Sequence, residues 1–442
     1  MKWIALTLFL ALIPVLQSWL TTNNRNAPYV WALLGFLPIL SEGLHIVIAP
    51  VSWAYWPGYV KGFEISAVES IACAVLLSRR KVPGGLPMKW LWIAYIFAVL
   101  LSTLFAPVPM AALFAAWQAL RMLLVFAAVA SIATDDRGPK AIISGMAIAL
   151  AINAGYAIQQ RLGGTLQAPG LFSHQNIAGM ASHFVAFPAL AMLLADKKYR
   201  MGLLAVAAAA VVAIAGASRG TIGLAAFGYA IVLGLSLLRK PTGRKTMILA
   251  LGIVGLLAVS PLAIGSLDRR FEATKALQSD YDERAAFEKA AWAMWHDHPM
   301  GVGANQFVNI ANVGGYWTNA GVAGVAGSRS AHVHNAYLLI SAEMGFGGLI
   351  AFFATLLFPL ILALRMAWRY KNDPRGDLMI GLSVAIAVVA MHSFFEWVVV
   401  TYTIQWLLAI NMGLIAGVAV QMSQATKARK KIPATSQRTQ NA

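Results

Sequence analysis

The sequence predicts an all-helical protein that crosses a membrane about twelve times. Of its 442 residues, 59% are hydrophobic and 12% are charged, whereas about 25% of residues are charged in ordinary soluble domains. Apolar runs of roughly 18 to 25 residues recur from end to end, each long enough to cross the hydrocarbon core as a helix. Because unpaired backbone groups are costly in lipid, such runs form helices and not open strands.

The placement of charge predicts the orientation in the membrane. The net charge of +17 is spread over short connectors between apolar runs, which argues against a nucleic-acid partner. Short basic connectors lie on the cytoplasmic side. The basic clusters are Arg79, Arg80, Lys81 and Lys89; Lys197, Lys198 and Arg200; Arg239, Lys240, Arg244 and Lys245; Arg365, Arg369, Lys371 and Arg375; and Lys427, Arg429, Lys430 and Lys431.

Apolar runs and basic connectors alternate consistently when they are counted back from the basic tail. The first run has no small-residue cleavage site after it, so we interpret it as a span and not as a signal peptide. The single cysteine, Cys73, lies in an apolar run and excludes an internal disulfide. The predicted spans are 3–20, 59–78, 88–106, 109–133, 139–158, 174–195, 201–216, 219–238, 246–264, 345–368, 378–398 and 403–421.

This count leaves no crossing for residues 29–56. Prolines such as Pro38 and Pro50 interrupt the stretch, and it contains Trp53 and Trp56, aromatic residues typical of membrane interfaces. We predict a half-inserted periplasmic hairpin here, with both chain termini inside. A thirteenth span with an external N-terminus is the alternative.

The predicted domains are an N-terminal transmembrane bundle (1–264), a large periplasmic loop (265–333), C-terminal transmembrane helices (334–421) and a basic cytoplasmic tail (422–442). Within the loop, Phe287, Ala291 and Met294 recur at helical spacing opposite charged positions. We therefore expect an amphipathic helix over 282–295 that lies on the membrane. The Gly- and Ala-rich stretch 311–331 predicts a mobile lid.

Two arginines stand where the positive-inside rule does not expect them. Arg219 lies at the outer end of one span and the start of the next, and Arg284 lies on the predicted amphipathic helix. Each could be an anion clamp, because a planar guanidinium suits a pyrophosphate. The alternatives are an interfacial arginine at 219 and an exposed ion pair between Arg284 and Glu288.

His334 ends the loop and opens the stretch H-N-A-Y-L-L-I-S-A-E-M-G-F-G-G. A histidine can accept a proton near neutral pH, as a sugar hydroxyl requires when it becomes a nucleophile. Asn335 could hold the ring or bind a sugar. Glu343 is expected to brace the helix junction.

Other polar residues are weaker candidates for substrate binding. His174 and Asn176 stand at the outer start of a span. Arg121 lies deep in the span 109–133 and could contact a lipid phosphate, and Glu64 and Glu69 could pair with such arginines.

Metal binding has two weak candidates in the sequence. His392 and Glu396 are four residues apart in one span, and Asp280 and Asp282 form a D-x-D in the loop. The first pair is more often a structural hydrogen bond, and a bare D-x-D is common by chance. Both patterns therefore stay weak candidates for a metal site.

Several motifs occur in a fixed order: S-R-G at a span junction, an arginine before a Trp-containing helix, H-P-x-G-V-G, and H-N-x-x-L followed by E-x-G-x-x-G. Together they resemble the superfamily of O-antigen ligases, O-antigen polymerases and bacterial protein O-oligosaccharyltransferases. The resemblance covers roughly residues 170–400. Chain length and the modest loop are most similar to the lipopolysaccharide O-antigen ligases.

The resemblance implies a C-type (GT-C) membrane glycosyltransferase of the bacterial inner membrane with a periplasmic active site. The donor would be a glycan on undecaprenyl pyrophosphate, and the acceptor a sugar hydroxyl of lipid A-core. His334 would be the base, and Arg219 and Arg284 would bind the pyrophosphate. No metal is expected in this family, and a single displacement would invert the anomeric carbon.

Three alternatives remain open at this stage. A polymerase would use a second lipid-linked glycan as acceptor, and a protein O-glycosyltransferase would use Ser or Thr. A polytopic transporter of lipid-linked glycans also fits about twelve spans, but it should contain a repeat and polar residues near the bilayer midplane.

Overall fold

The computed structural model describes residues 2–79, 82, 85–275 and 280–431. Arg80, Lys81 and residues 432–442 of the predicted basic tail lie outside this part. The predicted all-α membrane fold is confirmed, since ten helices of the described chain are long and apolar enough to cross a membrane. They are α1 (Lys2–Thr22), α2 (Ala27–Leu44), α5 (Pro109–Ile132), α6 (Arg137–Leu162), α7 (Gln175–Ala195), α9 (Arg219–Arg239), α10 (Gly243–Lys275), α15 (Ala336–Arg369), α16 (Arg375–His392) and α17 (Tyr402–Lys431).

The other elements are shorter and mostly connect the spans. Three apolar helices are shorter than a usual span, and β1 and β2 pair antiparallel. The elements are α3 (Ala67–Ser78), α4 (Lys89–Ser102) followed by η1 (Thr103–Phe105), α8 (Met201–Gly216), α11 (Asp280–Asp297), α12 (Phe307–Val313), α13 (Tyr316–Ala320), α14 (Ala326–Arg329), η2 (Val398–Val400), β1 (Val47–Ile48) and β2 (Ile65–Ser66).

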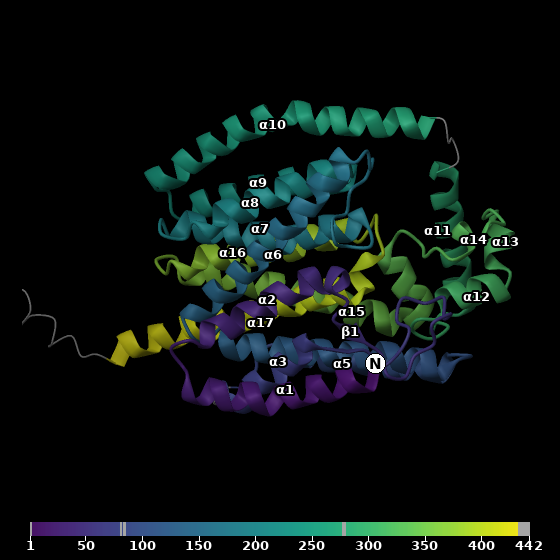
Figure 1. The fold of residues 1–442 in the computed structure, drawn as a ribbon, viewed down its shortest axis with the longest axis horizontal. Helices are drawn as coiled ribbons and strands as arrows, with labels where there is room; N and C mark the ends of the chain where they lie inside the picture. The colour runs from purple at the N-terminus through teal and green to yellow at the C-terminus, as the bar shows by residue number, and fades with distance from the viewer. Residues whose placement is uncertain (1, 80–81, 83–84, 276–279, 432–442) are drawn as a thin grey trace, which may run out of the picture.

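The long helices run side by side with nearly parallel axes, and α11 to α14 gather at one end of the bundle (Figure 1). Helix α7 lies in the centre, and its apolar window is completely buried. Helices α1 and α10 lie at opposite edges, and the apolar window of α10 has no buried residue in the described chain. A helix that is apolar all round but unburied is one that faces lipid.

Helix α2 overlaps the stretch 29–56, which was predicted to be a half-inserted hairpin. Residues 27–44 form α2, which is long enough to cross and packs along α6. The Arg137 Nη1 donates to the Asn24 carbonyl at 3.2 Å, so the turn after α1 lies beside the start of α6. The Lys2 Nζ lies 3.1 Å from the Ser52 Oγ, at the other end of α1. This arrangement favours the alternative of thirteen spans with an external N-terminus.

A helix forms at the stretch predicted to be amphipathic: α11, which runs across the axes of the long helices (Figure 1). Its position on the membrane surface stays a prediction. Phe287, Ala291 and Met294 are all buried on it, and it packs against α13 and α15. The stretch expected to be a lid folds into short helices around Trp317, whose buried ring meets those of Phe287 and Phe307.

A kink in α15 explains the H-P-x-G-V-G motif. Gly345 has φ 61° and ψ −160°, which interrupts the helical hydrogen bonds. The carbonyls of Ala342 and Glu343 accept instead from the backbone N–H groups of Val302 (3.0 Å) and Gly303 (2.8 Å). The glycine-rich turn therefore satisfies the groups that the kink leaves open.

Replacing Gly345 by alanine should destabilise the protein. The backbone conformation there is essentially restricted to glycine, and a Cβ would lie 2.3 Å from the Pro299 carbonyl oxygen. We expect a loss of about 1–3 kcal/mol in the free energy of unfolding, measured as thermal unfolding in detergent. Gly347→Ala is the matched control, because a Cβ there meets nothing within 4 Å of the described residues. Equal unfolding temperatures for both variants would contradict this account.

Candidate functional site

Polar side chains from four segments meet at the end of the bundle where α11 lies. His334 precedes α15, Glu396 follows α16, Arg284 lies on α11, and His174 and Asn176 begin α7. Apart from Glu396, all were predicted as site residues. The structure brings them together around the Glu396 carboxylate.

Local hydrogen bonds fix the segments that carry the two site histidines. The Asn335 Oδ1 caps α15 by accepting from the N–H groups of Tyr337 (3.0 Å) and Leu338 (3.2 Å). The Ala336 N–H donates to the Ser393 carbonyl at 2.9 Å, which ties this loop to the turn after α16. His174 caps α7, since its Nδ1 accepts from the Asn176 N–H at 3.2 Å. Asn335 thus caps α15, which is neither of the two roles predicted for it, holding the His334 ring or binding a sugar.

Glu396 is the centre of the cluster and is 4% exposed. Its Oε2 lies 3.2 Å from the Nδ1 of His334, its Oε1 lies 3.5 Å from the Nη2 of Arg284, and Oε1 also accepts from the Asn176 amide. Burial alone would raise the pKa of Glu396. The hydrogen bond from His334 and the positive charges beside it outweigh burial, so the pKa of Glu396 is lowered.

The pair of His334 and Glu396 has the geometry of a general base with its orienting carboxylate. An ionised carboxylate accepts a hydrogen bond from the Nδ1–H, which leaves Nε2 as the nitrogen that can take a proton from a substrate. The carboxylate also stabilises the imidazolium that forms. Arg284 contacts the same carboxylate while its side chain is 43% exposed, so its guanidinium is accessible to an anion beside the base.

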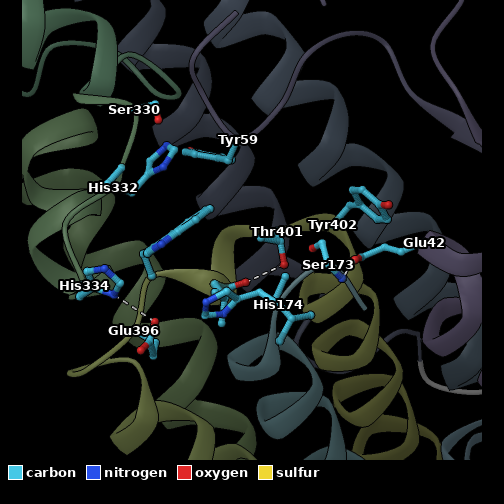
Figure 2. A pocket seen from close by; sticks show the side chains of 14 residues that line it. Glu42, Tyr59, Ser173, His174, Ser330, His332, His334, Glu396, Thr401 and Tyr402 are labelled. Carbon is cyan, nitrogen blue, oxygen red and sulfur yellow. Dashed lines mark hydrogen bonds and ion pairs between the residues drawn. The ribbon is translucent and has the colours of Figure 1, made fainter. Parts of the chain in front are cut away.

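A cavity of about 550 Å³ opens next to this pair. In Figure 2, His334 points towards Glu396 on one side of the cavity, His174 lies between, and Glu42 and Tyr402 stand on the opposite side. The lining residues are Glu42, Tyr59, Ser173, His174, Ile177, Ser330, Ala331, His332, His334, Glu396, Trp397, Val398, Thr401 and Tyr402. The cavity is large enough for one or two sugar rings.

Part of the chain around this site is similar to a known protein family. Residues 203–353 match the family model described as O-antigen ligase. Over these residues the chain is similar to the O-antigen ligase family. The matched residues include Arg219, Arg284 and His334, whereas His174 and Glu396 lie outside the match. No curated protein matches the chain significantly.

Arg219, which lies within the matched residues, is apart from the Glu396 cluster. It is exposed at the start of α9, and its guanidinium stands 4.7 Å from the ring centroid of Phe271 on α10. The next residue, Gly220, approaches His392, since a Cβ at Gly220 would lie 3.6 Å from the His392 Nε2. Arg219 is thus on the lipid-facing flank of the site and does not line the cavity.

Arg121 is placed differently from the prediction of a lipid-phosphate contact. It is 2% exposed, and its guanidinium pairs with Glu64 and Glu69, each at 3.0 Å. The Glu69 carboxylate also accepts from the Trp406 Nε1 at 2.9 Å. The predicted pairing of these glutamates with an arginine is confirmed. Because Arg121 is buried among carboxylates, it braces α3 and α17 against α5 and is closed to an anionic lipid.

The other residues predicted from the sequence have structural roles or lie outside the described residues. Glu343 is buried and accepts from the Tyr59 hydroxyl (2.8 Å) and the Phe307 N–H (3.0 Å), which confirms it as a brace. The partner of the Glu396 carboxylate is His334 and not the expected His392. The side chains of Asp280 and Asp282 lie outside the described residues.

Glu396 is the site residue that the sequence undervalued. Its signal was present, since it is an ionisable residue at the end of an apolar run, but its spacing from His392 suggested the wrong partner. His332 and Trp397 were not predicted at all. Nothing in their local sequence marks them, because they meet only when the loops before α15 and after α16 come together.

Acid should destabilise the site through Glu396. A carboxylate whose pKa is lowered by folding contributes stability above its unfolded pKa, about 4.3, and this is lost as pH falls through the folded pKa. We expect the unfolding temperature of the wild type to fall more steeply than that of Glu396→Gln below about pH 5. Thermal unfolding in detergent across pH 3 to 7 measures this; parallel curves would refute it.

Removing Arg121 should unfold the protein and not selectively weaken substrate binding. Arg121→Met leaves Glu64 and Glu69 buried without their cation, which costs about 3–5 kcal/mol. Denaturant unfolding in detergent measures this loss. Arg219→Met is the matched control, since an exposed arginine should change stability by less than about 0.5 kcal/mol. A stable Arg121→Met variant with weakened donor binding would restore the lipid-phosphate role.

Proposed function

We propose that this protein is an O-antigen ligase that transfers a glycan from undecaprenyl pyrophosphate to a sugar hydroxyl of lipid A-core. The reaction would take place at the periplasmic face of the bacterial inner membrane without a metal ion. The observation that carries the proposal is the contact between His334 Nδ1 and Glu396 Oε2 at the edge of a sugar-sized cavity. His334 lies within the residues that match the O-antigen ligase family model, and Glu396 lies beyond them.

The proposed reaction is one displacement. The His334 Nε2 takes the proton of the acceptor hydroxyl while the hydroxyl oxygen attacks the anomeric carbon of the donor. The bond from that carbon to the pyrophosphate oxygen breaks, and the lipid pyrophosphate leaves with the electron pair. Arg284 beside the base would stabilise the leaving charge. Attack from the side opposite the leaving group inverts the anomeric carbon.

The two arginines have different places in this proposal. Arg284 adjoins the base through Glu396, so it is assigned the phosphate next to the reacting carbon. Arg219 is exposed at the start of α9, beside the lipid-facing α10, and is assigned the phosphate nearer the lipid. A pyrophosphate held by guanidinium groups is already a good leaving group, which makes a divalent ion unnecessary.

Charge placement supports the periplasmic assignment. The site adjoins the turn between α16 and α17, whereas the basic connector with Arg369 and Arg375 joins the opposite ends of α15 and α16. The positive-inside rule favours a cytoplasmic position for this basic connector and so supports a site on the outer side. The gathering of polar residues at one end also favours an enzyme over a transporter, whose site would lie near the midplane.

A transfer assay with purified protein tests the proposal. It combines the undecaprenyl-pyrophosphate-linked glycan, lipid A-core and EDTA, and follows the product by gel shift. We expect activity in EDTA, a loss of about 10²–10⁴-fold in kcat for His334→Ala because the base is gone, and a similar loss for Glu396→Gln. His296→Ala is the matched control, since His296 lies on α11 with 90% of its side chain exposed.

Other outcomes would redirect the assignment. Chain growth with donor alone would make the protein a polymerase, and transfer to Ser or Thr of a protein acceptor would make it a protein O-glycosyltransferase. Loss of product in EDTA would direct attention to Asp280 and Asp282. Retained configuration in the product would exclude the single displacement.

A further inference from the structure

The part of the cavity beyond the His334 and Glu396 pair has no role in the reaction described above. Its wall contains Tyr59, His332, Trp397 and Tyr402, and Glu42 stands across from His334 (Figure 2). Aromatic and hydroxyl groups around a concave space are typical of sites that bind small polar molecules. This part of the cavity could therefore hold a group of one of the substrates.

His332 and Trp397 form the most distinctive part of the wall. Their ring centroids are 4.2 Å apart with an angle of 22° between the planes, so His332 backs the Trp397 indole. His332 is 5% exposed, and its Nε2 has no hydrogen-bond partner among the described residues. A buried polar atom without a partner costs free energy. A ligand in the cavity would supply the missing hydrogen bond.

The charges on the wall argue against a phosphate. None of the described residues that line the cavity is an arginine or lysine, and its carboxylates are Glu42 and Glu396. Burial and the neighbouring His334 lower the pKa of His332 to about 3, so its ring is neutral at pH 7. The Glu42 carboxylate accepts from the Ser173 N–H (2.6 Å) and the Thr403 hydroxyl (2.9 Å), which holds it in place. Such a wall repels anions and suits hydroxyl groups.

The position of the cavity indicates that it holds the acceptor sugar and not the donor pyrophosphate. The donor pyrophosphate needs the guanidinium groups, and neither Arg219 nor Arg284 lines the cavity. The acceptor hydroxyl must reach His334, where the cavity begins. We propose that the cavity between Glu396 and Glu42 is the acceptor subsite and that it takes a neutral, unphosphorylated sugar ring against Trp397, with a hydroxyl bonded to the His332 Nε2. This assignment rests on the proposed transferase function.

Binding of simple sugars to the full chain tests the subsite independently of transfer. Saturation-transfer NMR in nanodiscs would compare methyl α-glucopyranoside with glucose 6-phosphate, and empty nanodiscs give the background. We expect saturation of the ring protons of the neutral glycoside only, and its loss in Trp397→Ala. Trp292→Ala is the matched control, because Trp292 lies on α11 outside the cavity and is 55% exposed.

Transfer kinetics give a second readout. Trp397→Ala should raise the KM for the acceptor by roughly five- to tenfold, from loss of one aromatic contact, and leave the KM for the donor unchanged. Trp397→Phe keeps a ring, so it should restore most of the acceptor affinity, and it covers the case in which the alanine variant does not fold.

Specific results would overturn the subsite. They are equal or stronger saturation of glucose 6-phosphate, unchanged sugar binding in Trp397→Ala, or a change in kcat with both KM values unaltered. Failure of transfer by the wild type with every acceptor would instead overturn the proposed function. The NMR comparison would still decide whether the cavity binds a neutral sugar.

Discussion

The arrangement of the site depends on one buried carboxylate. Glu396 joins the loop before α15, the start of α7 and the amphipathic helix α11 through His334, Asn176 and Arg284. A buried carboxylate is costly unless it is paired, so the free energy that keeps it ionised also holds these segments together. In the proposed function, this pairing orients the His334 ring, as preorganised catalytic groups require.

The rest of the fold brings that carboxylate to its partners. The kink at Gly345 and the turn of Val302 and Gly303 anchor the region after α11 to α15, while Glu343 ties the same turn region to Tyr59. Buried ion pairs deeper in the bundle, such as Arg121 with Glu69, fix the helices to one another. Polar contacts suit this task because helices in lipid gain little from burying apolar surface.

Much of this architecture could be predicted from the sequence because lipid imposes a simple rule on it. Apolar length marks a span, so most of the long helices and the buried face of α11 with Phe287 could be predicted. Local sequence does not say which helix faces touch. Glu396 meets a histidine 62 residues away, and Arg121 meets glutamates over 50 residues away, so both partners depend on packing. The length of α2 was not predicted, because its prolines and aromatic neighbours are typical of an interfacial hairpin.

The unburied surface of α10 has a consequence for how the protein is handled. The apolar window of α10 has no buried residue among those described, and the Arg219 guanidinium lies over Phe271 on this helix. Extraction exchanges those lipids for detergent, so α10 is the helix whose surroundings change most. We therefore expect donor affinity to vary with the amphiphile used for purification, even where the chemistry at His334 is unaffected. In the proposed function, the surroundings of Arg219 thus depend on the amphiphile that covers α10.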